Sequence, residues 1–522
     1  MRPSIRTSVT TSLVLAAPLA LAACVAGPDY RGPPSVAPHA SASGQFHRGT
    51  AALVVGAPPP ARWWEALNDP ILTRLIDRAL ARSPTLHEAQ ARVRAARARL
   101  GEVRSRALPV GGGRALGVAA RVPTGALSSL SGRPGSDSGA TSDIDLYSVG
   151  FDASWELDVF GGVRRGVEAA SAQAAAQAAQ AQDAQVELAA EVAQAYVSFR
   201  NAQAQLRLAQ ESHALQRQIL DLVSQRRARG AATDGDVERV QAGLDQADVQ
   251  MAPLQGQLEQ IADRIALLTG GEPGARDAEL AAAAAAPMPP AVTPVGDPAA
   301  LLRRRPDIRA AERRLAASQA QIGQNVAQLF PSVTLLGDLG FVSTGPGRLL
   351  GADAFSAIGA PSLSWRILSY PQVRAQIRGA IASRDAEAAR YEATVLAALR
   401  DAEAALSRFG HQRQSLVALV RVDAAAGRAV ALAQVRYQGG TGSLIDVLQA
   451  ARQQNEIQRS LVESQAQLTK DYVALQKSLG LGWGETTASR GPDEGGRPMT
   501  QQPPQFTTQG ARRCPETKTR WC

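Results

Sequence analysis

Apolar and polar residues alternate along one stretch of the chain, and a very long helical pattern follows it. From Tyr147 to Leu157 every second residue is apolar, with Ser, Gly, Asp and Glu between them, which predicts a strand with one apolar and one polar face. Residues 165–229 contain no Pro and consist mostly of Ala, Gln, Glu, Leu, Val and Arg, which favour helix. A helix of that length would extend roughly 100 Å, at about 1.5 Å per residue. No compact domain needs such a helix.

Both patterns occur twice, because the chain is internally duplicated. Rare residues coincide when the chain is compared with itself at an offset of 210 positions. Upstream of Trp155 the offset becomes 222, so the first copy has a loop that is 12 residues longer between Pro109 and Trp155. The coincident residues are Ser154-Trp155 with Ser364-Trp365, Gly230 with Gly440, Asp236-Val237 with Asp446-Val447, Pro84 with Pro306, and Pro109 with Pro331.

Each copy is predicted to have four parts in the same order: a helix, a β-hairpin, a very long helix and a shorter helix. Strands of about ten residues suit a tilted transmembrane β-strand. A soluble, half-buried hairpin is the alternative that the pattern leaves open. In the second hairpin the apolar residues that share a face are Val333, Leu335, Leu339 and Phe341, then Phe355, Ala357, Leu363 and Trp365. The predicted ranges are 85–107, 108–160, 165–229 and 234–269 in the first copy, and 307–329, 331–369, 372–438 and 443–479 in the second.

The first 23 residues have the character of a signal peptide. Arg2 and Arg6 precede an apolar run over residues 9–21 that is too short to span a bilayer as a mature helix. The run closes on Leu21-Ala22-Ala23-Cys24, which resembles a bacterial lipobox. An ordinary Ala-x-Ala cleavage site beside a spare Cys is the alternative. We expect a mature chain that begins at a lipid-modified Cys24 and is anchored through that lipid.

The composition argues against several classes of function. The formal charge of +9 suggests nucleic-acid binding, but acidic residues are interleaved with the Arg residues, so no nucleic-acid partner is expected. The five His are scattered, and no metal-ligand spacing or phosphate-binding loop occurs. We therefore expect no enzyme, no metal site and no cofactor beyond the lipid on Cys24. Residues 481–522 are predicted to be a flexible extension, in which Cys514 and Cys522 form either a disulfide or two free thiols.

Four membrane strands are too few to close a barrel, because single-chain barrels begin at about eight strands. An open sheet would leave backbone groups unpaired in hydrocarbon, at several kcal/mol for each group. Closure therefore requires several copies of the chain. Long helices joined to these strands would continue such a barrel as a tube, which predicts a conduit.

Several runs of residues resemble the TolC-like outer membrane factors, in particular the lipoprotein branch that serves multidrug efflux (NodT/OprM-like). The resemblance covers nearly the whole chain. Its most typical run is Leu301-Leu302-Arg303-Arg304-Arg305-Pro306-Asp307-Ile308, followed by Phe330-Pro331. The other runs are Cys24-Val25-Ala26-Gly27-Pro28-Asp29-Tyr30, Trp63-Trp64, Asn68-Asp69-Pro70, Ser154-Trp155-Glu156-Leu157-Asp158-Val159-Phe160-Gly161, and Arg436-Tyr437 with Gly440 and Leu448.

The resemblance implies a mainly α fold with a transmembrane β-barrel portion: a homotrimer with a 12-stranded barrel in the outer membrane, continued by an α-helical periplasmic tunnel. The implied partners are a periplasmic adaptor protein, an inner-membrane efflux pump and outer membrane lipid. The pump is expected to be of the proton-driven RND type, and another class of exporter is the alternative. The implied function is that of the outer membrane channel in a tripartite efflux system, a passive duct to the exterior. A periplasmic lipid-anchored adaptor or a structural coiled-coil lipoprotein is the alternative.

The resemblance also supplies candidates for a periplasmic gate. Arg436 and Tyr437 match the Arg-Tyr pair whose hydrogen bonds and ion pairs hold the tunnel closed in the family. Many relatives carry an acidic residue where this chain has Gln449, which puts a charged ring in doubt there. Asp446 lies about one helical turn earlier and is the substitute candidate.

The turns at Gly230 and Gly440 are expected to face the adaptor. The resulting division of the chain is a signal peptide over 1–23, a lipidated and equatorial segment over 24–84, a first repeat over 85–270, a linker over 271–305, a second repeat over 306–480 and a tail over 481–522.

Overall fold

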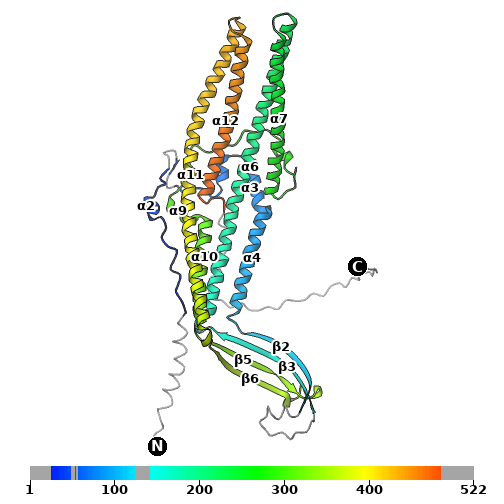
Figure 1. The fold of residues 1–522 in the computed structure, drawn as a ribbon, viewed down its shortest axis with the longest axis vertical. Helices are drawn as coiled ribbons and strands as arrows, with labels where there is room; N and C mark the ends of the chain where they lie inside the picture. Colours follow the sequence, from blue (N-terminus) through cyan, green and yellow to red (C-terminus); the bar gives the residue numbers. More distant parts are fainter. Residues whose placement is uncertain (1–24, 49–52, 55–56, 124–140, 484–522) are drawn as a thin grey trace, which may run out of the picture. The chain divides into compact units, whose positions relative to one another are not determined.

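The computed structural model describes residues 25–48, 53–54, 57–123 and 141–483. The expected signal peptide, Cys24 and the two tail cysteines lie outside these ranges. Within them, the order helix, β-hairpin, long helix, shorter helix occurs twice (Figure 1). The first set is α4 (Pro84–Ser105), β2 (Val110–Pro123), β3 (Thr141–Leu157), α6 (Gly162–Ala228) and α7 (Asp234–Leu268). The second is α10 (Pro306–Ala327), β5 (Ser332–Ser343), β6 (Phe355–Ser364), α11 (Tyr370–Gln438) and α12 (Leu444–Ser478).

Smaller elements surround these two sets. The segment before the first set forms α2 (Pro38–Ser43), β1 (Leu53–Val54), the 3-10 helix η1 (Trp63–Leu67) and α3 (Pro70–Arg82). The segment between the sets forms α8 (Asp277–Leu280), β4 (Thr293–Pro294), which pairs in parallel with β1, and α9 (Pro298–Arg304). Three further 3-10 turns are η2 (Pro346–Arg348), η3 (Ala352–Ala354) and η4 (Ile367–Ser369).

The structure moves several predicted boundaries by one or two residues. Helices α4 and α10 begin on Pro84 and Pro306 themselves, because a Pro at the first helical position loses no hydrogen bond and already has a helical φ. Strand β3 has 17 residues rather than about ten. Strand β6 ends at Ser364, so Trp365 is not part of the strand; its indole N–H instead donates to the Leu329 carbonyl at 3.1 Å.

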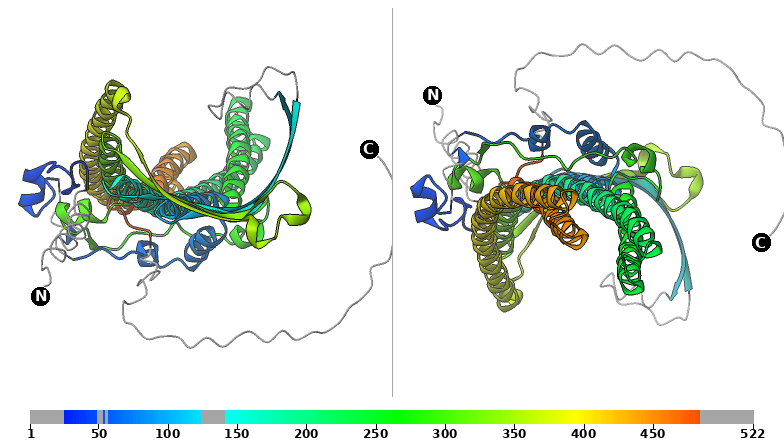
Figure 2. Two further views of the ribbon diagram at one scale, coloured as in Figure 1. Left: turned by 90° about the horizontal axis from the view of Figure 1, so that it is seen from below. Right: turned by 90° about the horizontal axis from the view of Figure 1, so that it is seen from above.

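The four long strands form one antiparallel sheet in the order β2-β3-β5-β6, which Figure 2 shows as a single curved layer. In its register Val149 lies opposite Phe341, and Leu363 lies opposite Val333. All odd-numbered strand residues therefore share one face, which carries every aromatic residue of the described strands, whereas aliphatic residues occur on both faces. The outer edges of β2 and β6 have no strand partner within the described residues.

The helices pack around a core at the level of α3. Helix α6 packs against α7, α11 packs against α12, and α10 lies between α6 and α11. Trp63 and Trp64 are almost completely buried there, with ring centroids 5.7 Å apart in an edge-on arrangement. Tyr472 and Phe409 extend this aromatic cluster into the second set of helices. In the described part of the chain, no helix combines the length and the apolar character that crossing a bilayer requires.

Candidate functional site

Helices α6 and α7 form one helical pair and α11 and α12 form another, and the turn at the tip of each pair is built in the same way. Gly230 and Gly440 have φ of 76° and 72°, a left-handed conformation that Gly adopts without a Cβ penalty. The next residue in each turn donates its backbone N–H back to the helix that is ending. Ala231 N–H donates to the Arg226 carbonyl at 2.8 Å, and Thr441 N–H to the Arg436 carbonyl at 2.9 Å.

Asp446 caps the helix that begins after the second tip. Ser443 Oγ accepts a hydrogen bond from the Asp446 backbone N–H at 3.1 Å, and the Asp446 carboxylate accepts one from the Ser443 backbone N–H at 3.0 Å. Hydrogen bonds to the Asp446 carboxylate from the Ser443 backbone, and then from the Ser443 side chain, lower the pKa of Asp446, and the charge of Arg436 adds to the effect. Thr233 and Asp236 form the same capping box in the first copy.

Tyr437 joins the two helical pairs, and its partner is Arg226. The Arg226 guanidinium donates to the Tyr437 hydroxyl at 2.5 Å and lies 5.3 Å from the centroid of its ring, within cation–π range. Arg436 and Gln449 are exposed on α11 and α12. The sequence interpretation missed Arg226 as a partner, although the 210-residue offset places it on Arg436.

A groove lies beside this contact, between α6 on one side and α11 and α12 on the other. Its volume is about 450 Å³. Leu215, Ile219 and Leu222 line it from α6, while Tyr437 and Leu448 line it from the second pair. Polar residues such as Gln218, Gln434 and Asn455 also line the groove, so its wall is mixed, and Tyr437 forms part of it.

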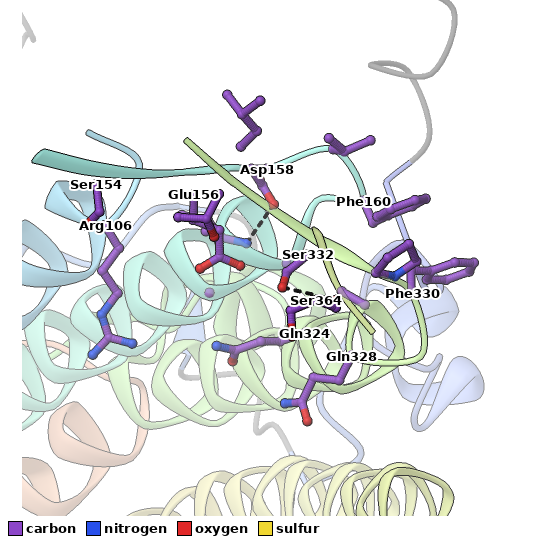
Figure 3. Close-up of a pocket in the computed structure, with 18 of the residues that line it drawn as sticks. Arg106, Ser154, Glu156, Asp158, Phe160, Gln324, Gln328, Phe330, Ser332 and Ser364 are labelled. Carbon is purple, nitrogen blue, oxygen red and sulfur yellow. Dashed lines mark hydrogen bonds between the residues drawn. The ribbon is translucent and has the colours of Figure 1, made fainter. Parts of the chain in front are cut away.

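The junction of sheet and helices has its own repeated contact. The Trp155 indole N–H donates to the Ala107 carbonyl at 3.0 Å, as Trp365 does to Leu329 in the second copy. Phe160 stacks on Phe330 with ring centroids 4.7 Å apart. A cavity of about 770 Å³ opens here, and Figure 3 shows its polar side chains. They include Ser154, Glu156, Ser332, Thr334 and Ser364 from the strands and Arg106, Gln324 and Gln328 from the helices.

The segment that follows Cys24 is held at this junction by Arg165, which is only 5% exposed. Its guanidinium donates to the carbonyls of Ala26 and Gly27, each at 3.2 Å, and to the Asp29 carboxylate at 2.5 Å. Burial opposes the charge, but the hydrogen bonds to Asp29 and Glu168 raise the pKa of Arg165 above its ordinary value. The backbone also approaches closely: a Cβ on Gly27 would lie 2.4 Å from the Cα of Gly323.

Among the residues that the structure describes, no three His, Cys, Asp or Glu side chains gather where they could hold a metal ion. The candidate site consists of helix–helix contacts with a groove beside them near the tips, and of sheet–helix contacts with a cavity at the junction.

A family model described as outer membrane efflux protein matches residues 75–271 and 298–481. The chain belongs to this family. Outer membrane protein OprJ of Pseudomonas aeruginosa is 32% identical over 479 residues, covering 90% of this chain and 95% of that protein. Toluene efflux pump outer membrane protein TtgF of Pseudomonas putida is 31% identical, covering 91% and 97%.

Solved structures agree with the sequence relatives. The outer-membrane channel OprN has 35% sequence identity and a TM-score of 0.78, with 88% of this chain and all of that chain covered. The fold is thus the TolC-like fold of outer membrane efflux channels, mainly helical with a β portion. This outer membrane efflux protein is a channel for efflux located in the outer membrane, and the match to both copies favours that function over an adaptor or a coiled-coil lipoprotein.

Proposed function

We propose that this channel is the passive exit duct of a tripartite efflux system and works as a homotrimer. The observation that carries the proposal is the four-stranded sheet, whose outer edges on β2 and β6 have no strand partner in the part of the chain that the structure describes. In a bilayer each unpaired backbone group costs several kcal/mol, so the edges must pair. Pairing β6 of one copy with β2 of the next closes a 12-stranded barrel after three copies. No catalytic step is needed, since the duct only conducts.

The tips are proposed to meet a periplasmic adaptor, which links the duct to an inner-membrane pump of the RND type. Helix α6 has 67 residues, so the turn at Gly230 lies about 100 Å from the sheet end of that helix. The turns at Gly230 and Gly440 are exposed and present the same backbone surface twice. A repeated surface suits a partner that binds several equivalent positions around one ring.

We further propose that Arg226 and Tyr437 form the contact that keeps the periplasmic end closed. The bond connects α6 to α11, so it must break if the two helical pairs are to move apart. A hydrogen bond to a charged donor contributes about 1.5–3 kcal/mol, less where water reaches it. Arg436, Asp446 and Gln449 are exposed in one chain and are proposed to contact the neighbouring copy.

Cys24 is proposed to carry the covalent lipid. The chain reaches Val25 beside Gly161 at the junction of sheet and helices, where Arg165 fixes the next residues. A lipid on the preceding residue would then leave the protein near the inner surface of the outer membrane. Acyl chains there would add anchoring to that of the barrel.

Conductance in planar bilayers, together with the mass of the detergent-extracted protein, tests these proposals. We expect a trimer with a small resting conductance. Tyr437→Phe removes the hydroxyl and keeps the ring, and Arg226→Gln removes the charge of the donor. Each variant should raise the resting conductance several-fold, because a loss of about 1.4 kcal/mol shifts the equilibrium between the closed and the open channel tenfold. Arg227→Gln is the matched control, since Arg227 pairs with Asp234 within the same tip.

Two results would contradict the proposals. A stable monomer that forms no pore would refute the duct. A trimer in which R227Q raises conductance as much as R226Q would remove the link between the helical pairs from gating.

A further inference from the structure

Three charged residues lie together on the even-numbered face of the sheet, midway along the strands. Asp152 of β3 and Asp338 of β5 are directly opposite each other in the register. Arg114 of β2 lies two residue pairs further along, opposite Gly150. Like charges directly opposite each other on neighbouring strands destabilise a sheet, and the positive charge of Arg114 beside the two carboxylates offsets their repulsion.

The Arg114 side chain crosses a whole strand to reach its partner. Its guanidinium donates to the Asp338 carboxylate at 3.1 Å, although β3 lies between β2 and β5. The crossing passes Gly150, which has no side chain and lies opposite Gly340. A Cβ on Gly150 would lie 2.7 Å from the Leu339 carbonyl oxygen, so the two strands approach too closely there for any other residue.

The even-numbered face is the one that would face water in a closed barrel. The odd-numbered face carries every aromatic residue of the described strands, among them the exposed Phe151 and Phe355, which suit hydrocarbon, whereas exposed aliphatic residues occur on both faces. A charged Arg in the middle of the lipid-facing surface would cost about 2–4 kcal/mol. The even-numbered face also continues into the polar cavity at the junction, through Ser154 and Thr334.

We infer that Arg114, Asp152 and Asp338 form a charge belt inside the barrel that favours positively charged solutes over negatively charged ones. The inference rests on the proposed duct and adds a selectivity to it. Two carboxylates and one guanidinium leave one net negative charge per copy, and hence three around a threefold ring. The Arg114 and Asp338 side chains are 61% and 34% exposed, so their charges act on the water of the lumen. Rings of Asp select cations in other channels by the same physics.

A reporter cysteine beside the belt tests the inference. Ser154→Cys places a thiol on the same face, two residues from Asp152, in a C514S/C522S background. Intact trimers in outer membranes are treated from outside with a cationic and with an anionic thiosulfonate reagent, and the ratio of the two rates is measured. The unaltered belt should favour the cationic reagent. D152N and D338N should each lower the ratio about three- to fivefold at low salt, and R114Q should raise it by a similar factor.

Asp145→Asn is the matched control, because it removes the same charge from the same strand on the opposite face. It should leave the ratio unchanged. The inference fails if S154C reacts with neither reagent in a protein that conducts, if the belt variants leave the ratio unmoved, or if D145N changes it equally. A protein that forms neither trimer nor pore instead refutes the duct itself, so the two failures are distinguishable.

Discussion

Asp183 provides a direct test of how burial and charge act inside the helical region. It lies on α6 and lines a cavity of about 350 Å³ between α6, α10, α11 and α12. Burial, and then the charges of Asp307 and Glu187, raise the pKa of Asp183 to about 6, although Arg305 and Lys477 act in the opposite direction. The other charged residues that line the cavity are Asp401 and Arg408.

The sign of the effect follows from the raised pKa. The folded protein holds the Asp183 proton more tightly than the unfolded chain, whose carboxyl has its ordinary pKa of 3.8. Folding stability from this group is therefore fully present below about pH 4 and is lost as the pH rises to about 6. At about 1.4 kcal/mol per pH unit, the difference between a pKa of 3.8 and one of about 6 amounts to about 3 kcal/mol.

Ionised Asp183 lowers the free energy of unfolding at pH 7, and Asp183→Asn should restore most of that loss. At pH 4 the substitution should change the free energy of unfolding little. The assay is thermal unfolding of the purified protein in detergent, followed by circular dichroism at both pH values. The midpoint of the variant should exceed that of the wild type by several degrees at pH 7, and the two should converge at pH 4. Asp221→Asn changes an exposed carboxyl on the same helix and serves as the control. Equal pH dependence in D183N and wild type would refute the reasoning.

Two further predictions concern the junction and the long helices. Arg165→Gln should free the segment around Ala26, because it loses hydrogen bonds worth about 2–3 kcal/mol. Limited proteolysis should then cleave the protein there, whereas Arg164→Gln at the neighbouring exposed position should leave cleavage unchanged. An R165Q protein that is not cut would refute the role of Arg165. Gly323→Ala should lower the unfolding midpoint, because the new Cβ would lie 2.8 Å from the Ala26 carbonyl oxygen. Gly379→Ala places its Cβ in open space and should raise the free energy of unfolding by about 0.5–1 kcal/mol. Midpoints that move the other way would contradict this account of the packing.

The sequence predicted those features of the fold that local pattern determines. The offset of 210 places Gly230 on Gly440 and Trp155 on Trp365, and the structure gives each pair the same turn or the same hydrogen bond. The long helices and hairpins also occur within a few residues of their predicted ranges, because an uninterrupted run of helix formers and a twofold alternation are local signals.

The contacts between distant elements could not be predicted in this way. Composition predicts that α6 is a helix, but the rotation of one helical pair against the other decides that Arg226 meets Tyr437. The register between β3 and β5 joins the two copies and has no signal in either strand alone, so the pairing of Asp152 with Asp338 was missed as well. Arg165 looks like any other Arg in an Arg-rich chain until its burial is known.

Several contacts between distant parts of the chain depend on residues at which the two copies differ. Positions that coincide under the offset build the scaffold: glycines at the tips, capping acids, and tryptophans at the junction. Where the copies depart from each other, one of them gains a contact that the other lacks. If position 437 repeated its counterpart, an Arg would face Arg226 and repel it, so the link between the helical pairs depends on the departure. The same holds for Arg165, whose counterpart under the offset is Ala375. Tyr437→Arg restores the repeat at one of these positions, so it should break the link between the helical pairs and leave the turns at both tips unchanged.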